Sequence, residues 1–399
     1  MTTPSDATTL QYDPYDPDIY ADPYPVFRRL REEAPLYYDE RYDFYAVSRF
    51  DDVERGLVDR ETFISSRGDV LEAIKDGIKG PPGFFIFEDP PQHTVHRTLL
   101  SRAFTPKQMR ELEPKIRDLC AAALDPFVGR DRIDFVADLG AQVPMRTIGM
   151  LLGIPESNQE ARREEADARL RTAPGKPRDY SQTMPTGESF AEYLDWRAEH
   201  PSDDLVTELL HVEFEDVDGT RRTLSKDELL VFVNLLFGAG NETTNRLIGW
   251  TAKLLSDHPD QRRVLAADPG LVPNAIEEVL RFEPPALQTA RYVDRDVELH
   301  GRTVQEGSVM LFLLAAANRD ERQFPDGERF DVLRRFSRHL TFSYGLHFCL
   351  GAALARLEAR VVFEEVLARF PDWEVDDAEA RLVPSTVRGW ETLPASISS

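Results

Sequence analysis

The strongest chemical signal in this sequence is the segment Phe342-Ser343-Tyr344-Gly345-Leu346-His347-Phe348-Cys349-Leu350-Gly351, which precedes a long amphipathic pattern. A cysteine just before a helix meets unpaired backbone N–H groups and the positive end of the helix dipole, and both lower the pKa of its thiol. Cys349 is therefore a candidate metal ligand. Gly345 would allow a tight turn beside a flat cofactor, and Gly351 would let the helix pack close to its plane. The alternative is a buried cysteine in a helix-entry turn.

The pattern on both sides of this segment is mainly helical. Apolar periodicity predicts helices at 114–128, 226–256, 273–282 and 350–370. Ser225 with Glu228 three residues later forms a capping-box pattern at the start of the second helix. Short β-rich runs at 36–38, at 44–47 and between 291 and 314 predict strands. The segment 172–189 reads as a loop, either a surface connection or a lid. The sequence predicts a mainly α protein with small β-sheets.

Composition limits the class of protein. The 399 residues contain no Gly/Ser-rich linker and no repeat, so we expect one domain over 1–399 with a flexible segment at 1–21. The net charge of −23 argues against a nucleic-acid partner. The longest apolar run, 309–317, is much shorter than the roughly 20 residues of a membrane span. With its polar N-terminal residues, this predicts a cytoplasmic protein without a membrane segment. Two cysteines, Cys120 and Cys349, cannot build a disulfide framework or a four-cysteine cluster.

Two further motifs have common structural explanations when each is taken alone. Glu278 and Arg281 lie three residues apart, as in many weak ion pairs on helix surfaces. The segment Ala239-Gly240-Asn241-Glu242-Thr243-Thr244 lies inside the predicted helix at 226–256. Alone it would be a solvated glutamate beside threonines that bond back to the helix. A mid-helix glycine costs about 1 kcal/mol relative to alanine, so Gly240 needs a compensating role.

Together these motifs closely resemble those of the bacterial class of cytochrome P450, a family of soluble haem-thiolate monooxygenases. The resemblance extends from Asp22-Pro23-Tyr24-Pro25 to Gly389 and covers nearly the whole chain. It implies a triangular helical prism with haem b between the long central helix and the helix after the cysteine. Cys349 would be the axial iron ligand, and Phe342 would cover its sulfur. The family usually has glycine where this chain has Ser343, so we expect an altered turn around the sulfur.

The resemblance also assigns basic residues to the haem propionates. His347, two residues before the cysteine, matches a histidine that contacts a propionate. His93 and Arg97 lie four residues apart on one helix face and could clamp a propionate. Arg291 matches another propionate-binding arginine. A buried dianionic cofactor needs such partners. His96 is expected to face elsewhere and to have no role.

The central helix acquires a catalytic interpretation from the same resemblance. Ala239 and Gly240 would leave space for dioxygen and substrate between the helix and the iron, and a local opening would free a backbone carbonyl for water. Glu242 and Thr243 match the acid–alcohol pair that relays protons to iron-bound oxygen.

A buried ion-pair network is implied as well. In the family the Glu-x-x-Arg pair, here Glu278 and Arg281, is buried and joined by a second arginine before the cysteine loop. Arg334 matches that position, and the role of all three would be structural.

The implied function is insertion of one oxygen atom of O2 into a hydrophobic small molecule such as a steroid, terpenoid, fatty acid or polyketide. We expect a monomer that receives electrons from a separate ferredoxin and ferredoxin reductase. A basic docking patch would contain Arg102, Lys107, Arg110, Arg334, Arg335, Arg338 and His339. Pocket walls are expected at 67–87, 172–189, 235–239 and 386–390, and the pocket residues named individually are Leu236, Ala239, Ala286, Leu287 and Gln288, with Arg67 and Gln288 as polar anchors.

Three alternatives remain. A peroxygenase would use hydrogen peroxide directly, but it would not need the pair Glu242 and Thr243. A catalytically silent haem sensor or recruitment protein could lose that pair or Cys349, and this chain keeps both. A helical scaffold without haem would require accidental matches to several motifs in the family's order.

Overall fold

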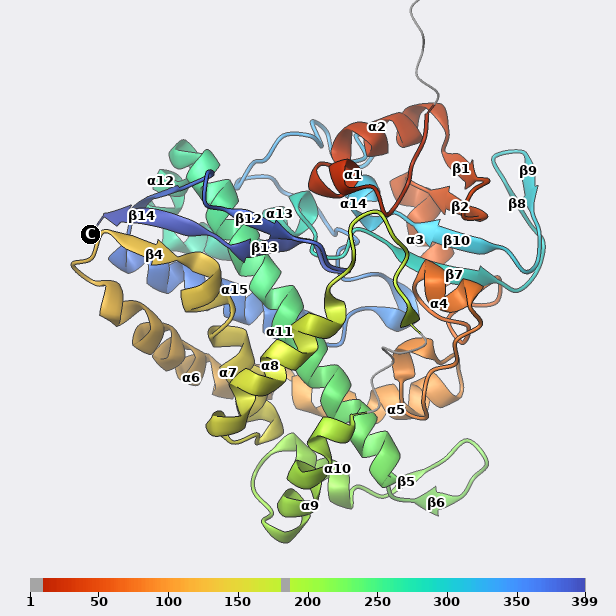
Figure 1. Cartoon of the computed structure of the whole chain (residues 1–399), viewed down its shortest axis with the longest axis horizontal. Helices are drawn as coiled ribbons and strands as arrows, with labels where there is room; N and C mark the ends of the chain where they lie inside the picture. The colour runs from red at the N-terminus through yellow and green to blue at the C-terminus, as the bar shows by residue number, and fades with distance from the viewer. Residues whose placement is uncertain (1–9, 181–186, 399) are drawn as a thin grey trace, which may run out of the picture.

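The computed structural model describes residues 10–180 and 187–398. Helices make up most of it and surround the long helix α11 (Figure 1). The α-helices are α1 (Pro17–Ala21), α2 (Tyr24–Glu33), α3 (Phe50–Val58), α4 (Leu71–Lys75), α5 (Gln92–Ser101), α6 (Pro106–Leu124), α7 (Val143–Leu152), α8 (Glu156–Leu170), α9 (Ala191–Glu199), α10 (Leu205–His211), α11 (Lys226–Asp257), α12 (Pro259–Ala267), α13 (Val272–Phe282), α14 (Leu314–Ala317) and α15 (Ala352–Arg369). Short helical turns are η1 (Phe85–Phe87), η2 (Arg102–Phe104), η3 (Asp125–Phe127), η4 (Phe135–Gly140), η6 (Glu188–Phe190), η7 (Pro269–Leu271) and η8 (Gly345–His347).

The strands form small sheets at the margins of the helical body (Figure 1). The five-stranded sheet has the order β1-β2-β10-β7-β3, with β2 and β10 parallel and the other neighbours antiparallel. A three-stranded sheet has the order β11-β14-β4, and three hairpins pair β12 with β13, β5 with β6 and β8 with β9. The strands are β1 (Leu36–Asp39), β2 (Phe44–Val47), β3 (Phe63–Ile64), β4 (Arg132–Asp134), β5 (Phe214–Glu215), β6 (Arg221–Arg222), β7 (Thr289–Val293), β8 (Val297–Leu299), β9 (Arg302–Val304), β10 (Val309–Phe312), β11 (Asp372–Val375), β12 (Arg381–Val383), β13 (Gly389–Thr392) and β14 (Pro394–Ser398).

Helix α11 is the central element, and its predicted start is confirmed. Ser225 Oγ accepts a hydrogen bond from Glu228 N at 3.2 Å, and Glu228 Oε2 accepts one from Ser225 N at 2.7 Å, which completes the capping box. The helix packs against α7, α8, α13 and α15. A Cβ on Gly240 would lie 3.2 Å from the side chain of Ile148 on α7, so this glycine allows two helices to approach closely.

The predicted helix at 114–128 is wrong at both ends. Helix α6 begins at Pro106, where Thr105 caps the helix through its hydroxyl, and it ends at Leu124. Pro114 lies inside the helix and not at its start. An interior proline costs about 3 kcal/mol or more, because it removes a hydrogen bond and crowds the preceding turn. Burial of apolar residues on both sides of it, including Met109 and Ile116, compensates for that cost.

The other predicted elements are confirmed to within two residues: the strands at 36–38 and 44–47, those between 291 and 314, and the helices at 226–256, 273–282 and 350–370. The segment expected to be flexible contains α1 and the buried Tyr12, which contacts Phe27, while residues 1–9 lie outside the described residues. Of the predicted loop 172–189, residues 181–186 also lie outside the described residues, residues 172–179 form no regular helix or strand, and Glu188 begins η6.

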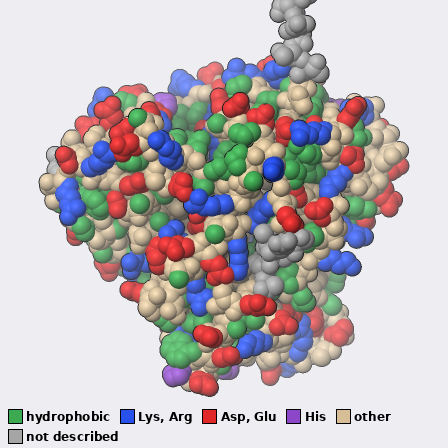
Figure 2. All heavy atoms as spheres, in the orientation of Figure 1, with side chains coloured by type: hydrophobic (Ala, Val, Ile, Leu, Met, Phe, Trp, Pro, Cys, Tyr) green, Lys and Arg blue, Asp and Glu red, His purple; other side chains and the backbone are tan. Residues whose placement is uncertain are grey.

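The surface carries both signs of charge. In Figure 2 acidic and basic side chains are interspersed over the visible face, without a large area of one sign. Among residues 10–180 and 187–398, none of the helices combines the length and the apolar character that a bilayer crossing requires.

Candidate active site

The loop before α15 folds back tightly around Cys349. Cys349 N donates to Phe342 O at 2.8 Å, and Ser343 N donates to Leu340 O at 2.8 Å. Gly345 has a φ of 72°, and a Cβ there would lie 3.0 Å from the carbonyl oxygen of Leu57. Ser343 has a φ of 61°, a left-handed conformation that costs a residue with a side chain about 1 kcal/mol. Glycine adopts this φ without that cost. The structure therefore gives a physical reason why the family that the sequence resembles usually has glycine where this chain has Ser343.

The predicted lowering of the Cys349 pKa is wrong in its net direction. Burial is the largest influence and raises the pKa, while the N–H groups of Gly351 and Ala352 and the charges of Arg97 and Arg356 lower it. Yet Cys349 is exposed, so its thiol borders a space that protein surrounds. A thiolate in such a place needs a nearby cation to offset the loss of hydration. The sulfur is thus suited to a metal ion.

Four predicted propionate partners gather beside this loop. The rings of His93 on α5 and His347 on η8 lie 4.4 Å apart. Arg97 Nη2 donates to Phe348 O at 2.6 Å. The charges of Arg291 and Arg97 both act on His347, and with burial as the largest cause they lower its pKa. Burial and then Arg97 likewise lower the pKa of His93 to about 4.

Among the described residues, none of these four side chains has a hydrogen bond or ion pair to a carboxylate, although Asp69 and Asp89 act on Arg291 at longer range. Within the described part of the chain, Nδ1 and Nε2 of His93 and Nε2 of His347 are buried without a hydrogen-bond partner. Arg291 is buried and donates only to neutral oxygens, Thr289 Oγ1 at 2.9 Å and Ala290 O at 2.6 Å. Each unsatisfied buried polar group costs roughly 1–3 kcal/mol. A cofactor with a central metal and two carboxylates, as in haem, fits these residues and the sulfur together.

The middle of α11 has one open face. Ala239 is exposed and Thr243 is half-buried, although Leu236 and Phe237 beside them are buried. Thr243 Oγ1 donates to Ala239 O at 2.7 Å, the back-bond that threonine often makes in helices. The helix is continuous here, so the expected local opening is not observed.

Glu242 points in another direction and is not solvated. Its side chain is 1% exposed, Oε1 accepts from Asn241 Nδ2 at 2.8 Å, and Oε2 lies 3.1 Å from Arg246 Nη2. Burial is the main cause that raises its pKa to about 7, while Arg246 lowers it and Asp167 raises it. A carboxyl with this pKa can both hold and release a proton near neutral pH.

The predicted ion-pair network has the expected geometry. Arg281 donates to both oxygens of Glu278, at 2.7 and 2.8 Å, and Arg334 Nε donates to Glu278 Oε1 at 3.1 Å. Arg281 also donates to the carbonyl oxygens of Asn318 and Gly327. Glu278 and Arg281 are fully buried, so this network joins α13 to the segment before the cysteine loop.

The predicted basic patch is partly wrong. Arg334 is engaged in this network, and His339 is buried with Nε2 3.2 Å from Glu277 Oε2. Arg338 is exposed but pairs with Glu54. The other four residues lie at the surface, namely Arg102, Lys107, Arg110 and Arg335.

The predicted pocket residues have mixed positions. Leu236 is buried in the core, and Ala286 and Leu287 are half-buried. Gln288 already has a partner, because its Oε1 accepts from Tyr12 OH at 2.6 Å. Arg67 lies over the ring of Tyr292 at 5.5 Å.

The sequence reasoning overlooked two networks. His96 was expected to have no role, but it is buried with Nδ1 2.8 Å from Glu88 Oε2 and Nε2 3.6 Å from Glu228 Oε1. Arg246 joins Glu242 to Asp167 on α8. Spacing could have found Arg246, four residues after Glu242, but not the distant partners.

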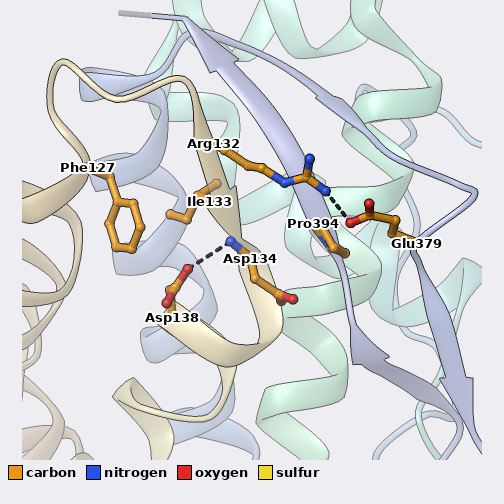
Figure 3. Close-up of a pocket in the computed structure, with 7 residues that line it drawn as sticks. All are labelled: Phe127, Arg132, Ile133, Asp134, Asp138, Glu379 and Pro394. Atoms are coloured by element: carbon orange, nitrogen blue, oxygen red, sulfur yellow. Dashed lines mark hydrogen bonds and ion pairs between the residues drawn. The ribbon is translucent and has the colours of Figure 1, made fainter.

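A surface hollow elsewhere has no part in this site. It is bordered by residues of β4 and by the start of β14, by Phe127 and Asp138, and by the ion pair of Arg132 with Glu379 (Figure 3). In Figure 1 these strands lie far from α5, which carries His93 and Arg97.

Comparisons with known proteins identify the relatives of this chain. The family model for Cytochrome P450 matches residues 270–388. Cytochrome P450 CYP107DY1 of Priestia megaterium is 38% identical over 316 residues, 77% of this chain and 75% of that protein. The vitamin D(3) 25-hydroxylase of Pseudonocardia autotrophica is 33% identical over 396 residues, 98% of this chain and 97% of that protein. The crystal structure of CYP109E1 from Bacillus megaterium in complex with testosterone has a TM-score of 0.86 at 28% identity, covering 96% of this chain and 99% of that one.

Proposed function

The chain belongs to the cytochrome P450 family, and from this premise we propose that it transfers one oxygen atom of O2 to a hydrophobic small molecule, with electrons from a separate ferredoxin and its reductase. The chain has the fold of that family and is a monooxygenase that uses haem b. The observation that carries the proposal is the exposed thiol of Cys349 beside four buried or half-buried basic side chains that form no ion pair with a carboxylate among the described residues.

We assign the binding of haem b to the residues around Cys349. The thiolate of Cys349 would ligate the iron, and Phe342 would shield the sulfur. Among the described residues, no atom lies within 4 Å of a Cβ placed on Gly351, which supports close approach of the cofactor. The two propionates would be bound by four basic residues, namely His93, His347, Arg97 and Arg291. When bound, haem b supplies the activation of O2 and the oxidising chemistry.

The protein's own part in turnover is orientation and proton supply. Glu242 holds a proton near neutral pH because burial raises its pKa to about 7. Thr243 Oγ lies on the open face of α11 and would take up that proton and hold it at this face of the helix. Ala239 on the same face would leave room for substrate.

A hydrophobic substrate of steroid size is the class we favour. The half-buried Ala286 and Leu287 are apolar candidates for the pocket wall, and Leu236 is a buried apolar candidate on α11. Because Gln288 bonds to Tyr12, few polar anchors remain for a ligand. One relative is named for hydroxylation of vitamin D(3), and one structural neighbour holds testosterone, which supports the same class.

Reduction by a ferredoxin is supported by exposed cations on α6, on η2 before it and at Arg335 beside α13. Arg102, Lys107, Arg110 and Arg335 are exposed. An acidic ferredoxin would be attracted to them. We expect Arg110→Glu to slow reduction several-fold at low salt, while Arg221→Glu on the β5–β6 hairpin leaves it unchanged. Equal rates for both variants would remove this surface from the proposal. The monomeric state and the cytoplasmic location stay predictions.

The first experiment is a carbon monoxide difference spectrum of the dithionite-reduced protein. We expect a strongly red-shifted Soret band in the wild type and in Cys120→Ser, and its absence in Cys349→Ser. Cys120 is a matched control, because it is a buried cysteine on α6. Haem without the shifted band in folded wild-type protein would point to a sensor or carrier, and a chain that binds no haem would contradict the assignment.

Titration of the ferric protein with testosterone, vitamin D3 and palmitic acid would then test the substrate class. A change of the ferric iron from low to high spin with testosterone or vitamin D3, and not with palmitic acid, supports our choice of substrate class. Turnover with ferredoxin should fall in Thr243→Ala. A peroxygenase would be favoured if turnover driven by hydrogen peroxide exceeds turnover with ferredoxin and is unchanged in Thr243→Ala.

A further inference from the structure

Glu242 is buried, so a proton that it gives away must be replaced along some route from solvent. Arg246 Nη2 lies 3.1 Å from Glu242 Oε2 and 3.0 Å from Asp167 Oδ1. One guanidinium therefore bridges two carboxylates, on helices α11 and α8, which lie side by side (Figure 1). The exposed fraction of the side chain rises from 1% at Glu242 to 14% at Asp167.

The contacts continue from Asp167 to the surface. Arg171 Nε and Nη2 each lie 3.1 Å from Asp167 Oδ2, and the same Nη2 donates to Glu391 Oε1 at 2.6 Å. Arg171 and Glu391 are 47% and 43% exposed. A continuous line of charged groups thus joins the buried acid to the exposed pair of Arg171 and Glu391, and among the described residues its one intermediate carboxyl is Asp167.

The residues around Arg246 hold its side chain in place within this line. Arg246 Nη1 donates to Trp390 O at 2.5 Å. A Cβ on Gly389 would lie 2.5 Å from Cδ of Arg246, so the glycine makes room for the arginine. The guanidinium is only 3% exposed, which fixes its position between the two carboxylates.

The charges decide which carboxyl holds the proton. Asp167 contacts two cations, Arg246 and Arg171. Glu242 shares Arg246 and otherwise faces the amide of Asn241 and, at longer range, Arg163. Burial raises the pKa of Glu242, the positive charge of Arg246 lowers it, and the negative charge of Asp167 raises it. The resulting pKa is about 7. Protonated Glu242 can donate its hydrogen bond to Asp167.

We propose that Asp167 is the outer proton-exchange group for Glu242, so that a proton lost from Glu242 is replaced from solvent through the Asp167 carboxyl. One proton moves in each step. Asp167 takes a proton from water at the surface and then donates it to the Glu242 carboxylate, which returns Asp167 to its ionised form. The inference rests on the proposed role of Glu242 in proton delivery. Asp167 acts through Glu242 and is therefore a positioning residue.

The first test measures protonation and not turnover. Infrared difference spectra of the ferric holoprotein across a pH titration would follow the C=O band of a buried carboxylic acid. We expect a band with a midpoint near pH 7 that disappears in Glu242→Gln. In Asp167→Asn the midpoint should fall by about one pH unit or more, because Glu242 loses a neighbouring negative charge and a hydrogen-bond acceptor. Glu164→Gln is the matched control, since it removes an exposed carboxylate from the same helix.

The second test measures product formed per NADPH consumed, with ferredoxin and its reductase and with testosterone or vitamin D3, whichever shifts the spin state. Asp167→Asn should lose roughly tenfold in product yield, since a positioned acid–base group contributes that much or more. Its pH profile should lose the limb near pH 7, and Asp167→Glu should restore both yield and profile. Asparagine keeps the size and the oxygen that binds Arg246, so haem content and thermal unfolding should match Glu164→Gln.

The outcomes separate this inference from the proposed function. If Glu242→Gln and Thr243→Ala both keep full product yield, the proposed relay fails. If those variants lose product while Asp167→Asn keeps the midpoint and yield of Glu164→Gln, the relay stands and the inference about Asp167 is overturned. If Asp167→Asn is poorly folded, Asp167→Ser decides on the same two readouts, because it also removes the carboxyl and keeps a hydroxyl as a hydrogen-bond partner for Arg246.

Discussion

Loss of His96 should remove a large pH dependence of stability. His96 is buried on α5 between Glu88, 2.8 Å from Nδ1, and Glu228, 3.6 Å from Nε2. Burial lowers its pKa, but the hydrogen bonds and charges of Glu228 and Glu88 outweigh this and raise it from 6.5 to about 9. The histidine is therefore cationic in the folded protein at neutral pH, and it joins α5 to the start of α11.

The magnitude follows from linkage. A shift of about 2.5 units at about 1.36 kcal/mol per unit corresponds to about 3 kcal/mol of unfolding free energy. Because the folded pKa is raised, this stabilisation is fully present below pH 6.5 and is lost as the pH rises through about 9. In His96→Gln we expect stability about 3 kcal/mol lower than wild type at pH 6 and nearly equal to it above pH 9.

Urea unfolding followed by tryptophan fluorescence at pH 6, 7, 8 and 9.5 would measure the difference. Other titrating groups cancel in the comparison of variant with wild type. His211→Gln is the control, because His211 is exposed on α10 and its hydrogen-bond partner is the backbone oxygen of Thr207 on the same helix. A constant difference between wild type and His96→Gln over this range would refute the assignment of a charged His96.

Three further outcomes are expected. Glu278→Gln should reduce stability by about 3–5 kcal/mol and lower haem content, since it leaves buried Arg281 without its carboxylate, as urea unfolding would show. Ser343→Gly should raise the thermal midpoint by an amount equivalent to about 1 kcal/mol, because φ at this position is 61°, and a lower midpoint would contradict the strain argument. Glu358 on α15 is fully buried, both its oxygens lack partners among the described residues, and burial raises its pKa well above 4.5. Because the folded pKa is raised, this unpartnered carboxyl costs the folded state more as the pH rises above about 4.5, so Glu358→Met should stabilise by about 1–3 kcal/mol and more at pH 8 than at pH 5 in the same assay.

The elements and the main motifs could be predicted because their signals are local. The capping box at Ser225 and the apolar periodicity of α11 lie within neighbouring residues, and both are confirmed. Glu278 and Arg281 are three residues apart on α13, so their pairing was also predictable. The start of α6 was wrong because Pro114 resembles a helix start when the packing of Met109 and Ile116 is unknown.

The electrostatics of the site could not be predicted in the same way, because they depend on burial and on distant partners. The helix start does lower the pKa of Cys349, but burial by the folded protein reverses the net direction. Gln288 was an available anchor in the sequence, whereas Tyr12, 276 residues away, accounts for its oxygen in the structure. Asp167 lies 79 residues from Arg246, and no spacing rule connects them.

The geometry of α11 explains why an acid and an alcohol must be adjacent in the sequence. Successive residues of an α-helix point about 100° apart, since one turn takes 3.6 residues. Thr243 and Ala239, four apart, therefore share the open face, while Glu242 points towards Arg246 and α8. A carboxyl four residues from Thr243 would lie on the open face too and would have no contact with the charged line to solvent. Because the two residues are adjacent, the Thr243 hydroxyl lies beside the enclosed space and the Glu242 carboxyl lies beside the charged line to solvent. The helix itself thus separates the two environments, and the proton has to cross only one residue step to pass between them.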